Sequence, residues 1–413
     1  MKSVGLWIAA LVALAAGSAG VTQHSTPYAT PVVEKPTDGD AGTFDGLLDL
    51  AEASPSSIVK VLWTHGMCTH PPSWVDDRVK RLVAAVGGTA ETKSLRAVGS
   101  RGASMRTERI STRGKTIEVM FLTWSPLTAS YKAALAYDAS ATEGGKDQYA
   151  RATLNRELKR GLVNDCLTDV VVYGGPNGND IRQAMNEAVC DALGGLFDGK
   201  NCNVLAGNWP AALALVTESL GSKLLFDAVL HIWNAAENSS DETAIDRLAN
   251  SLAATRMMYM LSNQVPLLDV AGSVAIDKTL EAASAPPRMR TSAGDVFSLL
   301  ARARSLAPLV SAPMTVVAFS DPNDLLSYRI VPAHLAEDLK EFRVINVLVS
   351  NDATYFGYLE RPDTAHCGYP WNPHVFGMLA RGYRAGKSLH SVSGLLGGSC
   401  ANYLWLAAPE AEK

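Results

Sequence analysis

The chain has 413 residues, of which 47% are hydrophobic and 19% charged, and its formal net charge is −4. This is the composition of a folded globular protein with a sizeable core. Charges of both signs are spread along the chain without a basic face or tail, which argues against nucleic acid as a partner. No internal repeat or long linker divides the chain, so we expect one elaborated domain over residues 46–408.

The N-terminus differs from the rest of the chain. Lys2 is followed by an almost wholly apolar run over residues 4–16 and by small residues at 17–20. This order is typical of a secretory signal, here residues 1–20, and the apolar run is short for a membrane span. An uncleaved anchor is the alternative. We therefore expect an exported protein without a stable membrane span after cleavage, and a flexible leader over residues 21–45.

Export changes how the cysteines are interpreted. An even number in an oxidising compartment permits up to three disulfides, with 15 possible pairings for six cysteines. Cys190 and Cys202 are close in sequence and flank a turn that contains glycine, so we favour that pair. The alternative is that some of the cysteines are free buried thiols. The six are Cys68, Cys166, Cys190, Cys202, Cys367 and Cys400.

The predicted elements alternate between strands and helices along the chain. Short apolar runs bounded by turn residues predict buried strands at 57–63, 116–123, 169–173, 211–217, 314–319 and 344–350. Apolar residues at helical spacing and capping residues predict helices at 73–86, 151–162, 181–196, 220–235 and 240–261. This alternation predicts an α/β fold, with a mostly parallel central sheet and helices on both faces. Residues 129–160 are interpreted as a helical lid insertion or, equally, as a surface helix pair.

One predicted strand runs directly into a tight turn and a helix. Residues 211–228 read AALALVTESLGSKLLFDA, and Ser219 stands in the turn. Such a turn exposes a serine hydroxyl at the end of the sheet, and the helix N-terminus adds positive potential there. The backbone N–H of Leu220 then stabilises an oxyanion. The alternative is a serine in an ordinary helix-capping turn, and Thr217 stands where the G-x-S-x-G pattern has its first glycine.

At this point the chain resembles the α/β-hydrolase superfamily, specifically its esterase and lipase-like members. The resemblance rests on the strand, the turn Thr217-Glu218-Ser219-Leu220-Gly221 and the helix after it, and it covers residues 57–382. It implies the α/β-hydrolase fold, a Ser–acid–His mechanism and ester hydrolysis.

An early strand ends at His65-Gly66-Met67. By the same resemblance this loop supplies the second oxyanion donor, the N–H of Met67, while Gly66 lets the backbone turn toward the substrate. A rival interpretation takes His65, Cys68 and His70 as metal ligands. Zinc needs three or four such ligands in fixed geometry, and no second cluster completes the set, so we expect no metal.

The resemblance places the acid and the base downstream of Ser219 in that order. A strand ending at residue 319 leads into a polar loop that holds Asp321 and Asp324. We prefer Asp324, which precedes two leucines as in the family, and keep Asp321 as the competitor because turns favour aspartate for capping alone. His366 lies in a loop after the last predicted strand, and we prefer it as the base over His374.

These residues predict hydrolysis of a small-molecule ester or lipid through an acyl-enzyme on Ser219, without a cofactor. Two alternatives stay open: an acyltransferase that uses the same serine, and an inactive protein that keeps the fold for binding. The glycine-rich residues 173–179 lack the Gly-Lys-Ser/Thr ending of a phosphate loop, so we do not interpret them as a nucleotide site.

Overall fold

The computed structural model describes residues 24–35, 41–99, 102–138, 152, 155–156, 158–205, 212–270, 292–307, 313–331, 342–356 and 358–392. The predicted signal, residues 21–23 and 36–40 of the predicted leader, Cys400 and about half of residues 129–160 lie outside these ranges. Among the described residues, no helix combines the length and the apolar character that crossing a bilayer requires.

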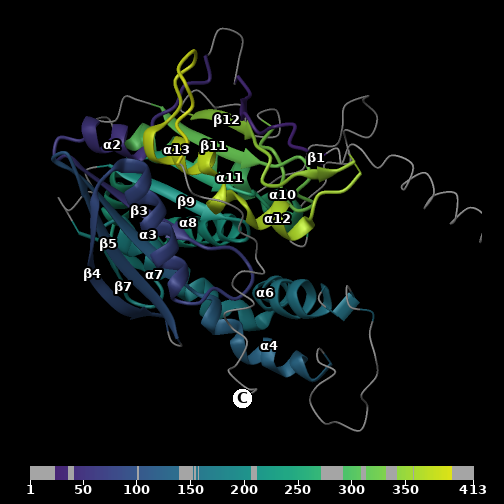
Figure 1. The fold of residues 1–413 in the computed structure, drawn as a ribbon. Helices are drawn as coiled ribbons and strands as arrows, with labels where there is room; N and C mark the ends of the chain where they lie inside the picture. Colours follow the sequence, from purple (N-terminus) through teal and green to yellow (C-terminus); the bar gives the residue numbers. More distant parts are fainter. Residues whose placement is uncertain are drawn as a thin grey trace, which may run out of the picture.

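A sheet of nine strands forms the centre of the described structure (Figure 1). Six neighbouring strands, from β12 to β6, run parallel, and antiparallel strands flank them at both edges. In sheet order the strands are β2 (Val32–Val33), β12 (Phe342–Leu348), β11 (Met314–Ser320), β10 (Thr255–Leu261), β9 (Leu213–Glu218), β3 (Ile58–Thr64), β6 (Lys115–Thr123), β5 (Ala103–Thr112) and β4 (Thr89–Val98). The coarse expectation of an α/β fold with a mostly parallel sheet is confirmed.

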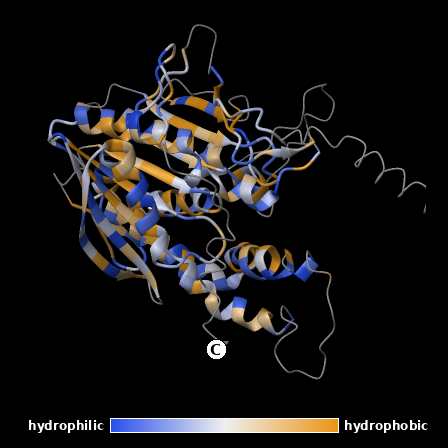
Figure 2. Ribbon diagram, viewed as in Figure 1, coloured by the Kyte–Doolittle hydropathy of each residue, from blue (hydrophilic) through white to orange (hydrophobic). Residues whose placement is uncertain are grey.

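Helices cover both faces of this sheet, which explains why its central strands are almost continuously apolar. Successive side chains point to opposite faces, so Leu215 joins one hydrophobic cluster and Val216 the other. Figure 2 shows hydrophobic residues concentrated in these strands. The first face carries α7 (Asn179–Ala192), α8 (Gly221–Glu237), α9 (Ala244–Ala253) and α11 (Ser292–Leu306); the second carries α2 (Leu47–Ala53), α3 (Ser73–Val86) and α13 (Pro373–Arg381).

Shorter elements lie between the strands and the main helices. Two small antiparallel pairs join β1 (His24–Ser25) to β13 (Thr354–Tyr355) and β7 (Gly195–Phe197) to β8 (Cys202–Val204). The short helices are η1 (Ser125–Thr128), α4 (Ala129–Leu135), η2 (Ala136–Asp138), the π-helix η3 (Leu158–Leu167), α6 (Thr168–Gly174), η4 (Pro176–Gly178), α10 (Val265–Asp269), α12 (Pro362–Cys367) and η8 (Tyr369–Trp371).

Helix α4, at the start of the predicted lid, stands with α6 at one end of the molecule (Figure 1). Lys132 of α4 forms ion pairs with Asp165 and Asp169, at 3.1 and 3.0 Å, and so joins the two helical segments. Val171 of α6 is 73% exposed.

Two predicted elements were wrong. Residues 169–173 form most of α6 instead of a strand, because Asp169, Val172 and Tyr173 are buried at helical spacing while Val171 points outward. Tertiary contacts override the strand propensity of the valines here. The predicted helix over 240–261 ends at Ala253 in α9, and its last residues form β10. Methionine and leucine favour helices in isolation, which concealed this buried strand.

Two further features correct or extend the predictions. The antiparallel pair β4 and β5 was not predicted, because β4 is exposed along most of its length and has no apolar pattern. The predicted helix over 181–196 ends at Ala192, and Gly194 follows with a left-handed φ of 76°.

The preferred disulfide is present. Cys190 and Cys202 are bonded with their Cα atoms 5.4 Å apart, a separation usual for a disulfide. A second bond joins Cys68 to Cys166, 98 positions apart. Cys367 is also disulfide-bonded, and none of the described cysteines is a free thiol. The alternative of free buried thiols is therefore wrong for these five.

Candidate active site

Ser219 occupies a strained turn between strand β9 and helix α8. The strand ends at Glu218 and the helix begins at Gly221, so two residues change the chain direction. Ser219 has a φ of 53°, in the left-handed region that few non-glycine residues adopt. Its backbone N–H donates to the carbonyl of Leu261 at 2.8 Å, which fixes the turn against β10. Backbone strain of this kind concentrates at functional sites.

Two glycines allow the chain to pack tightly around this turn. A Cβ atom on Gly66 would lie 2.6 Å from the Cβ of Ser219 and 2.8 Å from the carbonyl oxygen of Glu218. A Cβ atom on Gly221 would lie 2.8 Å from the carbonyl oxygen of His65. Both separations are shorter than real Cβ atoms show, so the loop after β3 approaches the serine only because these residues lack side chains.

Thr217 is the one departure from the G-x-S-x-G pattern, and the structure accommodates it. Its hydroxyl lies 2.8 Å from the hydroxyl of Ser222 in the first turn of α8. Both residues are buried, at 1% and 0% exposure. The threonine therefore satisfies a buried hydroxyl at the point where the strand and helix cross.

Ser219, His366 and Asp324 form one hydrogen-bonded chain. The distance from Ser219 Oγ to His366 Nε2 is 2.8 Å, and that from His366 Nδ1 to Asp324 Oδ1 is also 2.8 Å. Burial acts to raise the pKa of Asp324, but the charge and hydrogen bond of His366 outweigh it and hold that pKa below its usual value. An ionised carboxylate only accepts, so His366 donates from Nδ1 and accepts the serine proton at Nε2.

Further groups hold the carboxylate of Asp324. The hydroxyl of Ser262 donates to its Oδ2 at 2.7 Å, and that of Tyr369 donates to the same oxygen at 3.0 Å. The N–H of Leu326 donates to Oδ1 at 3.0 Å. The hydroxyl of Ser262 also lies 3.0 Å from His366 Nδ1. The chain of three side chains is thus fixed from several directions.

Three further residues of the site were not predicted from the sequence: Ser262, Gln264 and Tyr369. The side-chain nitrogen of Gln264 lies 3.2 Å from His366 Nε2, close to the serine hydrogen bond. Ser262 and Gln264 directly follow β10, and polar residues after a parallel strand are a recognisable signal. That signal was hidden because β10 had been interpreted as the end of a helix.

The two competing residues lie elsewhere. The carboxylate of Asp321 accepts from the backbone N–H groups of Asn323 and Asn351, at 2.9 and 2.6 Å, which is the capping role expected of the alternative. His374 lies in the first turn of α13, where its N–H donates to Asn372. The hydrogen-bond partner of His366 Nδ1 is therefore Asp324, and the histidine that contacts Ser219 is His366.

The loop after β3 carries the predicted oxyanion residues. Gly66 and Met67 line a pocket beside Ser219, and Leu220 is the N-cap residue of α8. Beyond Met67, the N–H of Cys68 donates to Asp169 at 2.7 Å, and the Cys68–Cys166 disulfide holds the loop to η3.

The ring of His65 connects this loop to Trp124. Its Nδ1 lies 2.8 Å from the carbonyl oxygen of Gly66, and its Nε2 accepts from the N–H of Trp124 at 3.1 Å. The ring stacks on Trp124. Burial lowers the pKa of His65 well below its usual value, and nearby His70 lowers it further, so the ring is neutral. The neutral ring thus holds the loop after β3 against Trp124.

The rival metal interpretation does not fit these residues. The sulfur of Cys68 is bonded to that of Cys166, and zinc binds the thiolate form of cysteine. Among the described residues, these two sulfurs and a carboxylate oxygen of Asp165 lie as close together as metal ligands would. Both ring nitrogens of His65 contact backbone groups instead.

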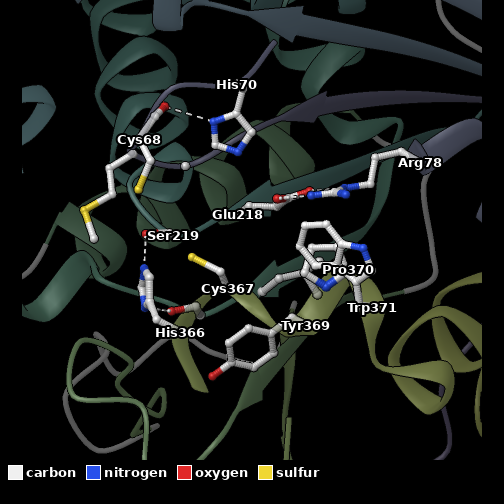
Figure 3. A pocket seen from close by; sticks show the side chains of 14 residues that line it. Cys68, His70, Arg78, Glu218, Ser219, His366, Cys367, Tyr369, Pro370 and Trp371 are labelled. Atoms are coloured by element: carbon white, nitrogen blue, oxygen red, sulfur yellow. Dashed lines mark hydrogen bonds and ion pairs between the residues drawn. The ribbon is translucent and has the colours of Figure 1, made fainter. Parts of the chain in front are cut away.

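A pocket opens from Ser219 toward a buried ion pair (Figure 3). Arg78 binds both carboxylate oxygens of Glu218, at 2.8 and 2.9 Å. Burial acts to raise the pKa of Glu218, but Arg78 outweighs it and the pKa falls below its usual value. The pocket is also lined by Trp371, whose ring centroid lies 4.9 Å from the guanidinium carbon of Arg78.

Comparison of the chain with protein-family models, curated proteins and solved structures finds no significant match.

Proposed function

We propose that this protein is a serine hydrolase with the α/β-hydrolase fold that cleaves carboxylic esters through an acyl-enzyme. The observation that carries the proposal is the buried chain from Ser219 Oγ through His366 to Asp324, with both distances at 2.8 Å. Its serine stands on a strained turn between a parallel strand and a helix. A nucleophile, a base and an orienting acid in this geometry are the parts that acyl transfer requires.

The first half of the reaction forms the acyl-enzyme. Ser219 Oγ attacks the carbonyl carbon of the ester while its proton passes to Nε2 of His366. The ionised Asp324 holds the Nδ1–H tautomer and stabilises the imidazolium. The bond from the carbonyl carbon to the alcohol oxygen then breaks, and the imidazolium gives its proton to the leaving alcohol.

The second half releases the acid. Water attacks the acyl carbon, gives its proton to Nε2 of His366, and the carbon–oxygen bond to Ser219 breaks as the serine recovers a proton. In both halves the backbone N–H groups of Met67 and Leu220 would stabilise the oxyanion. Such donors contribute about 3–4 kcal/mol each when one is removed from an enzyme of this kind.

Two arrangements support the proposed family, and the disulfides support export. The serine follows β9, the acid follows β11 and the histidine follows β12, which is the chain order Ser–Asp–His of α/β-hydrolases. The loop after β3 meets the serine turn through Gly66, where the family has its second oxyanion donor. Disulfides agree with an oxidising compartment. We therefore also propose that the protein is exported after removal of residues 1–20.

A fluorophosphonate probe tests the proposal, because it bonds covalently to an activated serine. We expect the wild-type protein to be labelled and Ser219→Ala to lose all labelling. Ser298→Ala is the matched control, since Ser298 is an exposed serine whose hydroxyl donates to Gly294 within α11. Equal labelling of wild type and Ser219→Ala, or none of either, would contradict the proposal.

Product analysis separates hydrolysis from acyl transfer. With a p-nitrophenyl ester in water we expect free acid, and added short alcohols should not divert most of the acyl group. Predominant ester exchange at low alcohol concentration would favour the acyltransferase alternative.

A further inference from the structure

The pocket beside Ser219 is small. Its cavity volume is about 30 Å³, and it is partly open to solvent. A single water needs roughly 10–15 Å³ on the same measure, so the pocket holds about two groups of that size. One or two carbons beyond an ester carbonyl would fill it.

A buried ion pair between Arg78 and Glu218 lines the pocket. Glu218 directly precedes Ser219, and its carboxylate accepts from Arg78 and from the indole of Trp63 at 2.8 Å. The side chains of Arg78 and Glu218 are 1% and 10% exposed. A longer apolar chain would have to reach across this pair and strip its remaining hydration, which costs free energy that an alkyl group does not return.

The walls are fixed on both sides of Ser219. Cys68 and Cys367 line the pocket and both are disulfide-bonded (Figure 3). Trp371 closes the side near Arg78 and packs against its guanidinium. A densely packed wall held by covalent bonds resists the displacement that a larger group would need.

The pocket also suits one part of the ester better than the other. The acyl group stays bonded to Ser219 until water attacks, whereas the alcohol leaves after His366 protonates it. A small space against the serine therefore matches the group that remains, and the open side of the pocket gives the alcohol a path to solvent.

We infer that this pocket selects the acyl group and restricts the enzyme to esters of short acids, acetyl and propionyl esters above all. The inference rests on the proposed function and narrows its substrate class. Ser219 takes the short acyl group with release of an alcohol, and water then releases acetate or propionate.

The wild-type protein tests this directly with p-nitrophenyl acetate, propionate, butyrate and octanoate. One methylene that a pocket cannot hold changes kcat/KM by roughly 10–200-fold, so we expect a fall of at least tenfold from propionate to butyrate and a larger one to octanoate. A flat profile, or a preference for octanoate, overturns the inference.

A second series varies the alcohol while the acyl group stays acetyl. We expect methyl, butyl and octyl acetate to differ by less than the acyl series does. Strong discrimination here with a flat acyl series would place the alcohol in the pocket and overturn the assignment.

Trp371→Leu widens the pocket, and we expect the butyrate-to-acetate ratio of kcat/KM to rise by at least tenfold. Trp233→Leu is the matched control. Trp233 is a buried tryptophan of α8 whose ring contacts the guanidinium of Arg302, and it is not among the residues that line this pocket. An unchanged ratio in a folded Trp371→Leu protein contradicts the inference. If that variant does not fold, the wild-type acyl series decides.

Fluorophosphonate labelling distinguishes a failure of the short-acyl inference from a failure of the proposed function. A protein that is labelled at Ser219 but hydrolyses long-chain esters best refutes the short-acyl inference and leaves the proposed function intact. A protein that is neither labelled nor active on any ester refutes both.

Discussion

At the scale of single residues, the candidate site depends on how Asp324 is kept ionised in a buried position. Two hydroxyl groups, a backbone N–H and His366 all donate to its two oxygens. Hydrogen bonds to a charged group contribute about 1.5–3 kcal/mol, which is enough to offset much of the cost of burial. Tyr369 does more than one task here, because its hydroxyl also accepts from the N–H of Asp321 at 2.7 Å.

Tyr369→Phe tests this arrangement. The substitution removes one donor to Asp324 and leaves the N–H of Asp321 without its acceptor. We expect kcat/KM on p-nitrophenyl acetate to fall about tenfold, which corresponds to ~1.4 kcal/mol. The acid limb of the pH–rate profile should also move to higher pH, because the pKa of Asp324 rises when its carboxylate loses a hydrogen-bond donor.

Tyr259→Phe is the control for that experiment. Tyr259 is buried, and its hydroxyl donates to the backbone carbonyl of Asp45 instead of to Asp324. It should lose thermal stability with little change in kcat/KM or in the pH profile. A Tyr369→Phe protein that behaves in the same way would show that Tyr369 has only a structural role.

Gly66 gives a second prediction at this scale. Alanine there would place its Cβ 2.6 Å from the Cβ of Ser219, so either the loop or the serine must move. A displacement of about 1 Å at a reacting group costs about 100-fold in rate, and we expect Gly66→Ala to lose at least that much in kcat. Gly174→Ala is the control, because nothing lies within 4 Å of a Cβ at that position. Near-normal kcat in Gly66→Ala would contradict the tight approach.

At the scale of elements, the junction of β9 and α8 decides where the serine stands. Thr217 and Ser222 share a buried hydrogen bond across this junction. Thr217→Val removes one hydroxyl and leaves that of Ser222 buried without this partner, which costs about 1–3 kcal/mol. Ser222→Ala should cost a similar amount for the same reason.

The double variant makes this prediction specific. Replacing both hydroxyls by apolar groups removes the unsatisfied group, so the loss of unfolding free energy in Thr217→Val/Ser222→Ala should be smaller than the sum of the two single losses, by about 0.5–3 kcal/mol. Denaturant unfolding of the four proteins measures this coupling. Additive losses would show that the two hydroxyls act independently.

The elements also explain what sequence alone could and could not predict. Strands β3, β6, β9, β11 and β12 were predicted because burial on both faces makes them continuously apolar. Strand β10 was missed because Met257, Met258 and Met260 suit a helix equally well in isolation. β4 was missed because an exposed edge strand needs no apolar pattern.

The same reasoning applies to the site. A local strand–turn–helix pattern pointed to Ser219, whereas the resemblance pointed to Asp324 and His366. His366 was expected in a loop, but it lies in the short helix α12. Ser262 and Gln264 follow the strand that was missed. Tyr369 reaches Asp324 from a short turn 45 positions away, a proximity that only the folded chain creates.

At the scale of the whole molecule, a pair of acids behind the site links stability to pH. Glu360 accepts from Asn323 at 2.7 Å and from the N–H of Asp352 at 3.1 Å. Burial and, second to it, the neighbouring charge of Asp321 together raise the pKa of Glu360 from its usual 4.5 to about 8. Asp321 and Asp324 lie in the same loop after β11. The pair of Asp321 and Glu360 therefore supports the segment that orients His366.

The sign of the effect follows from proton binding. The folded protein keeps a proton on Glu360 that the unfolded chain releases near pH 4.5, so its contribution to stability is present at low pH and is lost as the pH rises toward about 8. Glu360→Gln cannot ionise and should remove this loss. We therefore expect the variant to have a higher Tm than wild type at pH 8 and a similar Tm at pH 4.5, measured by thermal unfolding in both buffers. Glu52→Gln, at an exposed position on α2, is the control. If Glu360→Gln lowers the Tm equally at both pH values, the carboxyl is ionised in the folded protein and its role is that of an acceptor alone.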